Sequence, residues 1–142
     1  EELAGACMGD VVVQGALRAN VLTLTGQVAA GETIAAGDVV QWNSAGDLVT
    51  GTNGSGTTNP FAGIALEAGT SLESIAIAYG GNVDVTTSGT LTGGQRVSWS
   101  GTDFRAATGS DSRVIGIALD SHNGVGSTTI SMQVLPEFYL LP

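Results

Sequence analysis

Short runs of apolar and β-branched residues, separated by Gly, Asn, Asp and Ser, make up most of the chain from residue 21 onward. Runs of this length between turn residues predict β-strands. The expected strands are 21–25, 38–42, 48–50, 61–66, 75–79, 83–85, 96–99, 104–106, 114–119 and 129–135. No stretch favours a helix longer than a turn or two, so the pattern predicts an all-β fold.

The central runs of this pattern occur twice. The stretch 61–66, Phe-Ala-Gly-Ile-Ala-Leu, is matched by 114–119, Val-Ile-Gly-Ile-Ala-Leu, and the strand ending at Trp42 is matched by the strand ending at Trp99. The spacing between matched positions differs slightly from run to run, because the connecting loops differ in length. Matched strands with variable loops are typical of a duplicated β unit.

These boundaries give the expected domain organisation. We predict a small β-barrel or β-tulip-like domain built from two tandem β repeats. A preceding stretch has no sustained period apart from the triplet Val11, Val12, Val13, so we interpret it as an extended arm that a partner orders. The expected parts are the N-terminal arm 1–20, the duplicated domain 21–136 with repeats at about 34–85 and 91–135, and the apolar C-terminal tail 137–142.

Glycine and polar residues mark the connections between the strands. The stretch 51–59 has no apolar residue, which predicts a surface loop before the strand that follows Pro60. The pairs Gly80-Gly81 and Gly93-Gly94 are expected at turns or β-bulges, where glycine tolerates backbone conformations that other residues avoid. We expect Gly80-Gly81 to turn the chain between the strands 75–79 and 83–85.

Charge and composition exclude several classes of function. The 142-residue chain has no Lys, and thirteen acidic residues against four Arg give a net charge of −9. A nucleic-acid backbone would be repelled on average, so no nucleic-acid partner is expected. No apolar run approaches the length of a membrane helix, so no membrane partner is expected. A single cysteine, Cys7, cannot form an internal disulfide.

Catalytic chemistry is not expected. Asp120, Ser121 and His122 are consecutive, but a triad depends on spatial geometry, and adjacent residues of a strand or loop point in different directions. A polar hairpin loop is the favoured interpretation of this stretch. We therefore predict that the protein is not an enzyme.

Metal and cofactor binding are not expected either. Asp103, Asp111 and Asp120 lie in predicted loops and could offer oxygen ligands to calcium, but their spacing is not that of an EF-hand. One Cys and one His cannot form a four-ligand zinc site, and a phosphate-binding loop would need a lysine. We predict no metal and no cofactor.

The two tryptophans leave an alternative open. Trp42 and Trp99 occupy equivalent places in the two repeats, so they could form an aromatic platform for a carbohydrate, as in an adhesion module of a virion or cell surface. Their equivalence favours the same packing role used twice, in the core or at an interface. The apolar tail residues Phe138, Tyr139 and Leu140, with Leu141, are expected to pack on their own sheet or on a neighbouring subunit.

The arrangement resembles the capsid decoration, or cement, proteins of tailed bacteriophages, in particular the DUF2190-type proteins and, more distantly, the lambda-like head decoration proteins. The resemblance covers about residues 34–135 and leaves the arm and the tail outside. The stretches that carry it are 36–40 (AGDVV), 63–69 (GIALEAG), 75–85 (IAIAYGGNVDV), 91–97 (LTGGQRV) and 115–120 (IGIALD).

The resemblance implies a structural virion protein, made in the host cytoplasm, that binds the outer surface of the assembled capsid and stabilises it by bridging capsomers. The implied partners are the major capsid protein and further copies of the chain, commonly as a homotrimer. The arm could add a strand to the capsid protein. The residues predicted to contact the capsid or other copies are Val11, Val12, Val13, Trp42, Trp99, Phe138, Tyr139 and Leu140.

Overall fold

A computed structural model describes residues 21–52, 60–109, 111 and 113–135. This part of the chain forms strands and contains no helix, and therefore none long enough to cross a membrane. The strands are β1 (Val21–Gln27), β2 (Thr33–Ile34), β3 (Val39–Trp42), β4 (Leu48–Thr50), β5 (Phe61–Ala65), β6 (Gly69–Thr70), β7 (Ser74–Thr87), β8 (Thr90–Leu91), β9 (Arg96–Trp99), β10 (Phe104–Ala106), β11 (Gly116–Ala118), β12 (His122–Asn123) and β13 (Thr128–Val134).

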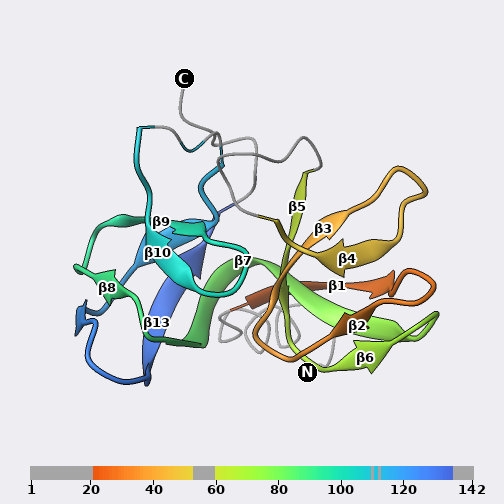
Figure 1. Cartoon of the computed structure of the whole chain (residues 1–142), viewed down its shortest axis with the longest axis horizontal. Coiled ribbons are helices and arrows are strands. Elements are labelled where there is room, and N and C mark those ends of the chain that lie inside the picture. Colours follow the sequence, from red (N-terminus) through yellow and green to blue (C-terminus); the bar gives the residue numbers. More distant parts are fainter. Residues whose placement is uncertain (1–20, 53–59, 110, 112, 136–142) are drawn as a thin grey trace, which may run out of the picture.

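Nine of these strands form one antiparallel sheet, in the order β10-β9-β11-β13-β7-β5-β3-β4, and β1 pairs with β7 beside this path. The remaining strands form the two-stranded ladders β2–β6 and β8–β12. The large sheet curls strongly, so that its two ends form two rounded lobes joined by β7 (Figure 1). The prediction of an all-β, small barrel-like fold is confirmed.

The same pairings recur in the two halves of the chain. In the first half β2 pairs with β6, β3 pairs with β4 and β5, and β5 pairs with β7. In the second half β8 pairs with β12, β9 pairs with β10 and β11, and β11 pairs with β13. Single hydrogen bonds recur as well: the Leu66 amide donates to the Ala76 carbonyl, and the Leu119 amide donates to the Ser131 carbonyl, each at 2.9 Å.

The longest strand, β7, departs from the sequence prediction. A turn at Gly80-Gly81 was expected, but β7 runs through these residues without reversing direction. In the ladder between β1 and β7, Thr23 lies opposite Ala78 and Leu22 lies opposite Gly80, so Tyr79 is an extra residue. Gly81 follows with φ of 88°, a conformation that favours glycine. The turn was therefore wrong and the alternative, a β-bulge, was right, because a bulge also uses these residues to bend a strand.

The buried side chains form two apolar clusters on opposite faces of the first lobe's strands. Val39 belongs to the larger cluster and its neighbour Val40 to the smaller, because successive residues of a strand point to opposite faces. The larger cluster continues into the second lobe, where it includes Trp99 and Phe104. The core therefore extends across both halves of the chain.

Several predictions lie outside the described residues. These are the arm 1–20 with Val11, Val12 and Val13, most of the predicted loop 51–59, and the tail with Phe138, Tyr139 and Leu140.

Candidate functional site

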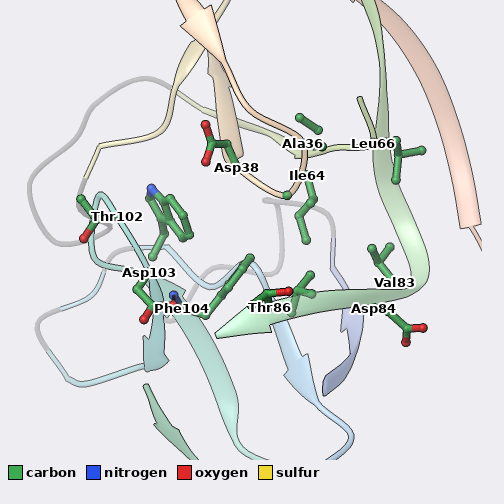
Figure 2. A pocket seen from close by; sticks show the side chains of 14 residues that line it. Ala36, Asp38, Ile64, Leu66, Val83, Asp84, Thr86, Thr102, Asp103 and Phe104 are labelled. Atoms are coloured by element: carbon green, nitrogen blue, oxygen red, sulfur yellow. Dashed lines mark hydrogen bonds between the residues drawn. The ribbon is translucent and has the colours of Figure 1, made fainter. Parts of the chain in front are cut away.

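A pocket of about 370 Å³ lies where the two lobes meet (Figure 2). Its walls come from the β2–β3 turn, the end of β5, the second half of β7 and the β9–β10 hairpin. The lining residues are Ala36, Gly37, Asp38, Ile64, Ala65, Leu66, Val83, Asp84, Val85, Thr86, Trp99, Thr102, Asp103 and Phe104. Both repeats therefore contribute to it.

The pocket follows an edge of β7. Four consecutive residues, Val83–Thr86, line it, although alternate side chains of a strand point to opposite faces. A cavity that touches consecutive residues must run beside the strand. Strand β13 pairs with this part of β7 and contributes no residue to the lining, and neither does β1. The end of β5 lines the pocket with Ile64, Ala65 and Leu66.

Three carboxylates lie around the pocket, each accepting hydrogen bonds from the protein. Asp38 Oδ2 accepts from the Ala35 amide at 2.9 Å, which closes the β2–β3 turn. Asp84 Oδ1 accepts from Ser131 Oγ of β13 at 2.8 Å. The three carboxylates thus give the rim of the pocket a negative charge without forming a metal cage: no group of three His, Cys, Asp or Glu side chains within the described ranges could hold a metal ion.

The third carboxylate, Asp103, joins the β9–β10 hairpin to the end of β7. Its Oδ1 accepts hydrogen bonds from Thr87 Oγ1 at 3.0 Å and from the Phe104 amide at 2.8 Å, and its Oδ2 accepts from the hydroxyl and amide of Ser88. Burial raises the pKa of Asp103, but these hydrogen bonds lower it by more, so the pKa lies below its ordinary value. The folded protein thus favours the charged form.

The remaining calcium candidates lie elsewhere. Asp111 forms an ion pair with Arg105, with 2.5 Å between Oδ1 and Nη2, and Oδ2 accepts from the Thr108 amide at 2.6 Å. Burial raises the pKa of Asp111, whereas the hydrogen bond from Arg105 and the bonds from Thr108 lower it, so the net shift is downward. Asp120 Oδ2 accepts from the Ser131 amide at 2.8 Å. Each of these carboxylates stabilises its own loop.

These two lowered pKa values predict acid sensitivity. A carboxyl group whose pKa is lower in the folded than in the unfolded state stabilises the fold above the unfolded pKa, and this contribution is lost as the pH falls through the folded pKa. We expect the urea midpoint to fall below about pH 4, the ordinary pKa of Asp. Asp103→Asn should lower the midpoint at pH 7 and flatten its decline in acid, as measured by circular dichroism.

A matched control is Thr102→Ala, at the exposed neighbour of Asp103 in the same hairpin. It should leave the slope of the urea midpoint against pH unchanged. An Asp103→Asn protein with the full acid decline would contradict the assignment of this carboxylate.

The consecutive residues Asp120, Ser121 and His122 do not form a triad. Ser121 Oγ accepts a hydrogen bond from the Gly93 amide at 2.9 Å, and His122 Nδ1 lies 2.9 Å from the Gly89 carbonyl oxygen, to which it donates. These bonds join the connection between β11 and β12 to Gly89 and Gly93, the residues that flank β8. Asp120 and Ser121 lie just before β12 and His122 begins that strand, so these residues form a polar connection, close to the polar hairpin loop that the sequence favoured.

The two tryptophans differ in their surroundings. Trp99 is 3% exposed, its indole N–H donates to the Gly51 carbonyl at 2.9 Å, and its ring meets that of Phe104 edge to face at 4.9 Å. Trp99 is thus a core residue, which corrects the expectation that it contacts a neighbouring molecule. Trp42 is half-buried and lines a second, apolar pocket of about 220 Å³ together with Leu24 and Tyr79.

Sequence reasoning missed the apolar residues that this fold leaves at the surface. Leu22 is 56% exposed and Tyr79 is 38% exposed, on paired strands β1 and β7. The side chain of Leu22 lies over Gly80. Tyr79 is the extra residue of the bulge, and no sequence signal marks which residue of this stretch a bulge turns outward.

The described residues form a curled all-β domain with a pocket where its two lobes meet. No family model matches the chain, and no curated protein matches it. Among solved structures it is similar to the N base of the head fiber gp8.5 of bacteriophage phi29, with a TM-score of 0.56 and 10% sequence identity. The match covers 85% of this chain and 99% of that chain. At this identity the likeness concerns the fold.

Proposed function

We propose that this protein is a structural component of a bacteriophage virion that binds the outer surface of the assembled capsid. It acts as a homotrimer that binds the major capsid protein and stabilises the capsid by bridging neighbouring capsomers. The observation that carries the proposal is the shared fold with the base of a phage head fiber, which extends over 99% of that neighbour. The sequence resemblance to capsid decoration proteins suggested the same role, although no family model matches the chain.

The surface of the domain suits a contact role. Leu22 and Tyr79 place exposed apolar area on adjacent strands, and exposed apolar side chains that lie together are typical of protein–protein contacts. A rigid sheet offers such contacts without having to become ordered on binding. Binding at many equivalent sites of a particle lets weak single contacts accumulate.

The direct test is to mix the purified full chain with undecorated, expanded phage heads and to sediment the particles. We expect the protein to co-sediment and, free in solution, to have the mass of a trimer by analytical ultracentrifugation. Deletion of residues 1–20 should weaken binding on the order of tenfold, the effect of losing a few backbone hydrogen bonds.

A useful matched pair is Leu22→Ser and Leu72→Ser. Both side chains are more than half exposed, at 56% and 58%, but Leu72 lies in the turn before β7 rather than beside Tyr79. We expect only Leu22→Ser to weaken binding to heads. Protein that stays in the supernatant under all conditions would contradict the capsid role.

A further inference from the structure

The turn between β12 and β13 begins with an Asn-Gly pair whose atoms are placed to react with each other. Asn123 ends β12, Gly124 follows it with φ of 82°, and both residues are exposed. Asn123 Oδ1 accepts a hydrogen bond from the Val125 amide at 2.9 Å. This bond closes a ring of atoms that contains the side-chain carbonyl carbon of Asn123, Cγ, and the backbone nitrogen of Gly124. The fold therefore holds this carbon and this nitrogen close together.

We propose that Asn123 is a site of spontaneous modification, in which the Gly124 nitrogen attacks Asn123 Cγ and expels ammonia. The nitrogen gives up its proton and forms a bond to Cγ, while the bond from Cγ to Nδ2 breaks and Nδ2 leaves as ammonia. The product is a cyclic succinimide. Water then opens the ring at either carbonyl group and leaves aspartate or isoaspartate at position 123. The net reaction consumes water and releases ammonia, and no oxidant or reductant is needed.

Two neighbouring groups favour this reaction. The Val125 amide already donates to Asn123 Oδ1, the oxygen on which negative charge develops during the attack. His122 Nδ1 lies 3.2 Å from the Gly124 nitrogen. With its hydrogen on Nδ1, His122 donates to the Gly89 carbonyl, whereas the tautomer with the hydrogen on Nε2 lets Nδ1 accept the proton that Gly124 loses. A proton acceptor thus lies beside the attacking nitrogen.

The absence of a side chain on Gly124 is the third favourable feature. A side chain on the residue after an asparagine crowds the attacking nitrogen, and glycine has none. Asn43 offers a comparison within the same fold, because its Oδ1 also accepts from the amide two residues further on, that of Ala45, at 2.9 Å. Ser44 follows Asn43, however. Among the asparagines that the structure describes, only Asn123 is followed by glycine.

The modification would disturb a short ladder of the second lobe. Asn123 lies opposite Thr90 and His122 lies opposite Leu91, and these two pairs make up the whole β8–β12 ladder. Aspartate adds a negative charge to a chain whose net charge is −9. Isoaspartate also inserts one atom into the backbone, and an insertion of this kind breaks the register of a strand. We therefore expect the isoaspartate form to be less stable than the native protein.

Ageing of the purified full chain tests the proposal, and it requires no capsid, so it is independent of the proposed function. The folded protein is incubated in mildly alkaline buffer, and conversion at each asparagine is followed by peptide mapping with mass spectrometry. We expect Asn123 to convert about tenfold faster than Asn43 or the exposed Asn82, which Val83 follows. A rate at Asn123 no higher than at these two positions would overturn the proposal.

His122→Gln examines the assistance from the fold. It should slow conversion at Asn123 in the folded protein and leave the rate unchanged in urea, where the contact between His122 and Gly124 is lost. A variant that only loosened the turn would not slow the reaction. An equal rate for the folded variant and the folded native protein would therefore contradict the role of His122 as proton acceptor.

Asn123→Gln provides the matched control for the loss of stability. The longer side chain keeps the amide group but would have to close a larger ring, so we expect no conversion at this position. After the same incubation, the urea midpoint should fall for the native protein and stay unchanged for Asn123→Gln. An equal decline in both proteins would show that ageing does not act through this site.

Discussion

Among substitutions that add a single methyl group to a described glycine, Gly63→Ala is expected to destabilise the protein most. A Cβ atom at Gly63 would lie 2.0 Å from the Ala78 carbonyl oxygen of the paired strand β7, and Gly63 has φ of 151°, which L residues rarely adopt. Backbone atoms cannot yield as a side chain can. We expect a loss of about 3–5 kcal/mol in the free energy of unfolding, measured by urea denaturation.

The equivalent position in the second half provides a comparison. A Cβ at Gly116 would lie 2.3 Å from the Gln133 carbonyl oxygen of β13, but Gly116 has no positive φ. Gly116→Ala should therefore cost somewhat less than Gly63→Ala. Gly109→Ala is the matched control, because nothing lies within 4 Å of its Cβ, and its effect should stay within about 0.5 kcal/mol. A Gly63→Ala protein as stable as Gly109→Ala would contradict the close approach of β5 and β7.

These two glycines also show what the sequence could and could not predict. The repeated run Gly-Ile-Ala-Leu predicted two equivalent strands, and both are present, as β5 and β11. Its glycine is required because the neighbouring strand's backbone lies so close. That neighbour is twelve or more residues away in the chain, so the reason for the glycine appears only in the folded structure.

The connections were harder to predict than the strands. The ladders β2–β6 and β8–β12 were not predicted, because a strand of two residues has no period. The stretch 75–85 was divided into two strands at Gly80-Gly81, since a glycine pair is compatible with both a turn and a bulge. Pairing with β1 on one side and β13 on the other makes β7 continuous, and such long-range pairing is not visible in a local pattern.

The candidate site shows the same limit. The alternation of Val83, Asp84 and Val85 correctly indicated a strand with one wet face. It did not indicate that this part of β7 lines a pocket, because that depends on which elements of the fold lie beside the strand.

Trp99→Ala is expected to cost about 3–5 kcal/mol, the range for removing a buried aromatic side chain. The change removes the edge-to-face contact with Phe104 and leaves the buried Gly51 carbonyl without the indole donor. Trp99→Phe keeps an aromatic ring and removes the donor, so it should cost less. The free energies are measured by circular dichroism in urea, because fluorescence would lose its main reporter.

Trp42→Ala is the matched comparison, since Trp42 ends β3 as Trp99 ends β9 but is only half-buried. Because Trp42 buries less apolar area than Trp99, its removal should cost only about 1–2 kcal/mol. The Trp42→Ala variant also tests the carbohydrate alternative, because a half-buried ring beside an apolar pocket is a place where a sugar could stack. We expect a glycan array to show no binding by the native protein. Glycan binding that Trp42→Ala abolishes while the fold persists would replace the capsid role with that of a carbohydrate-binding module.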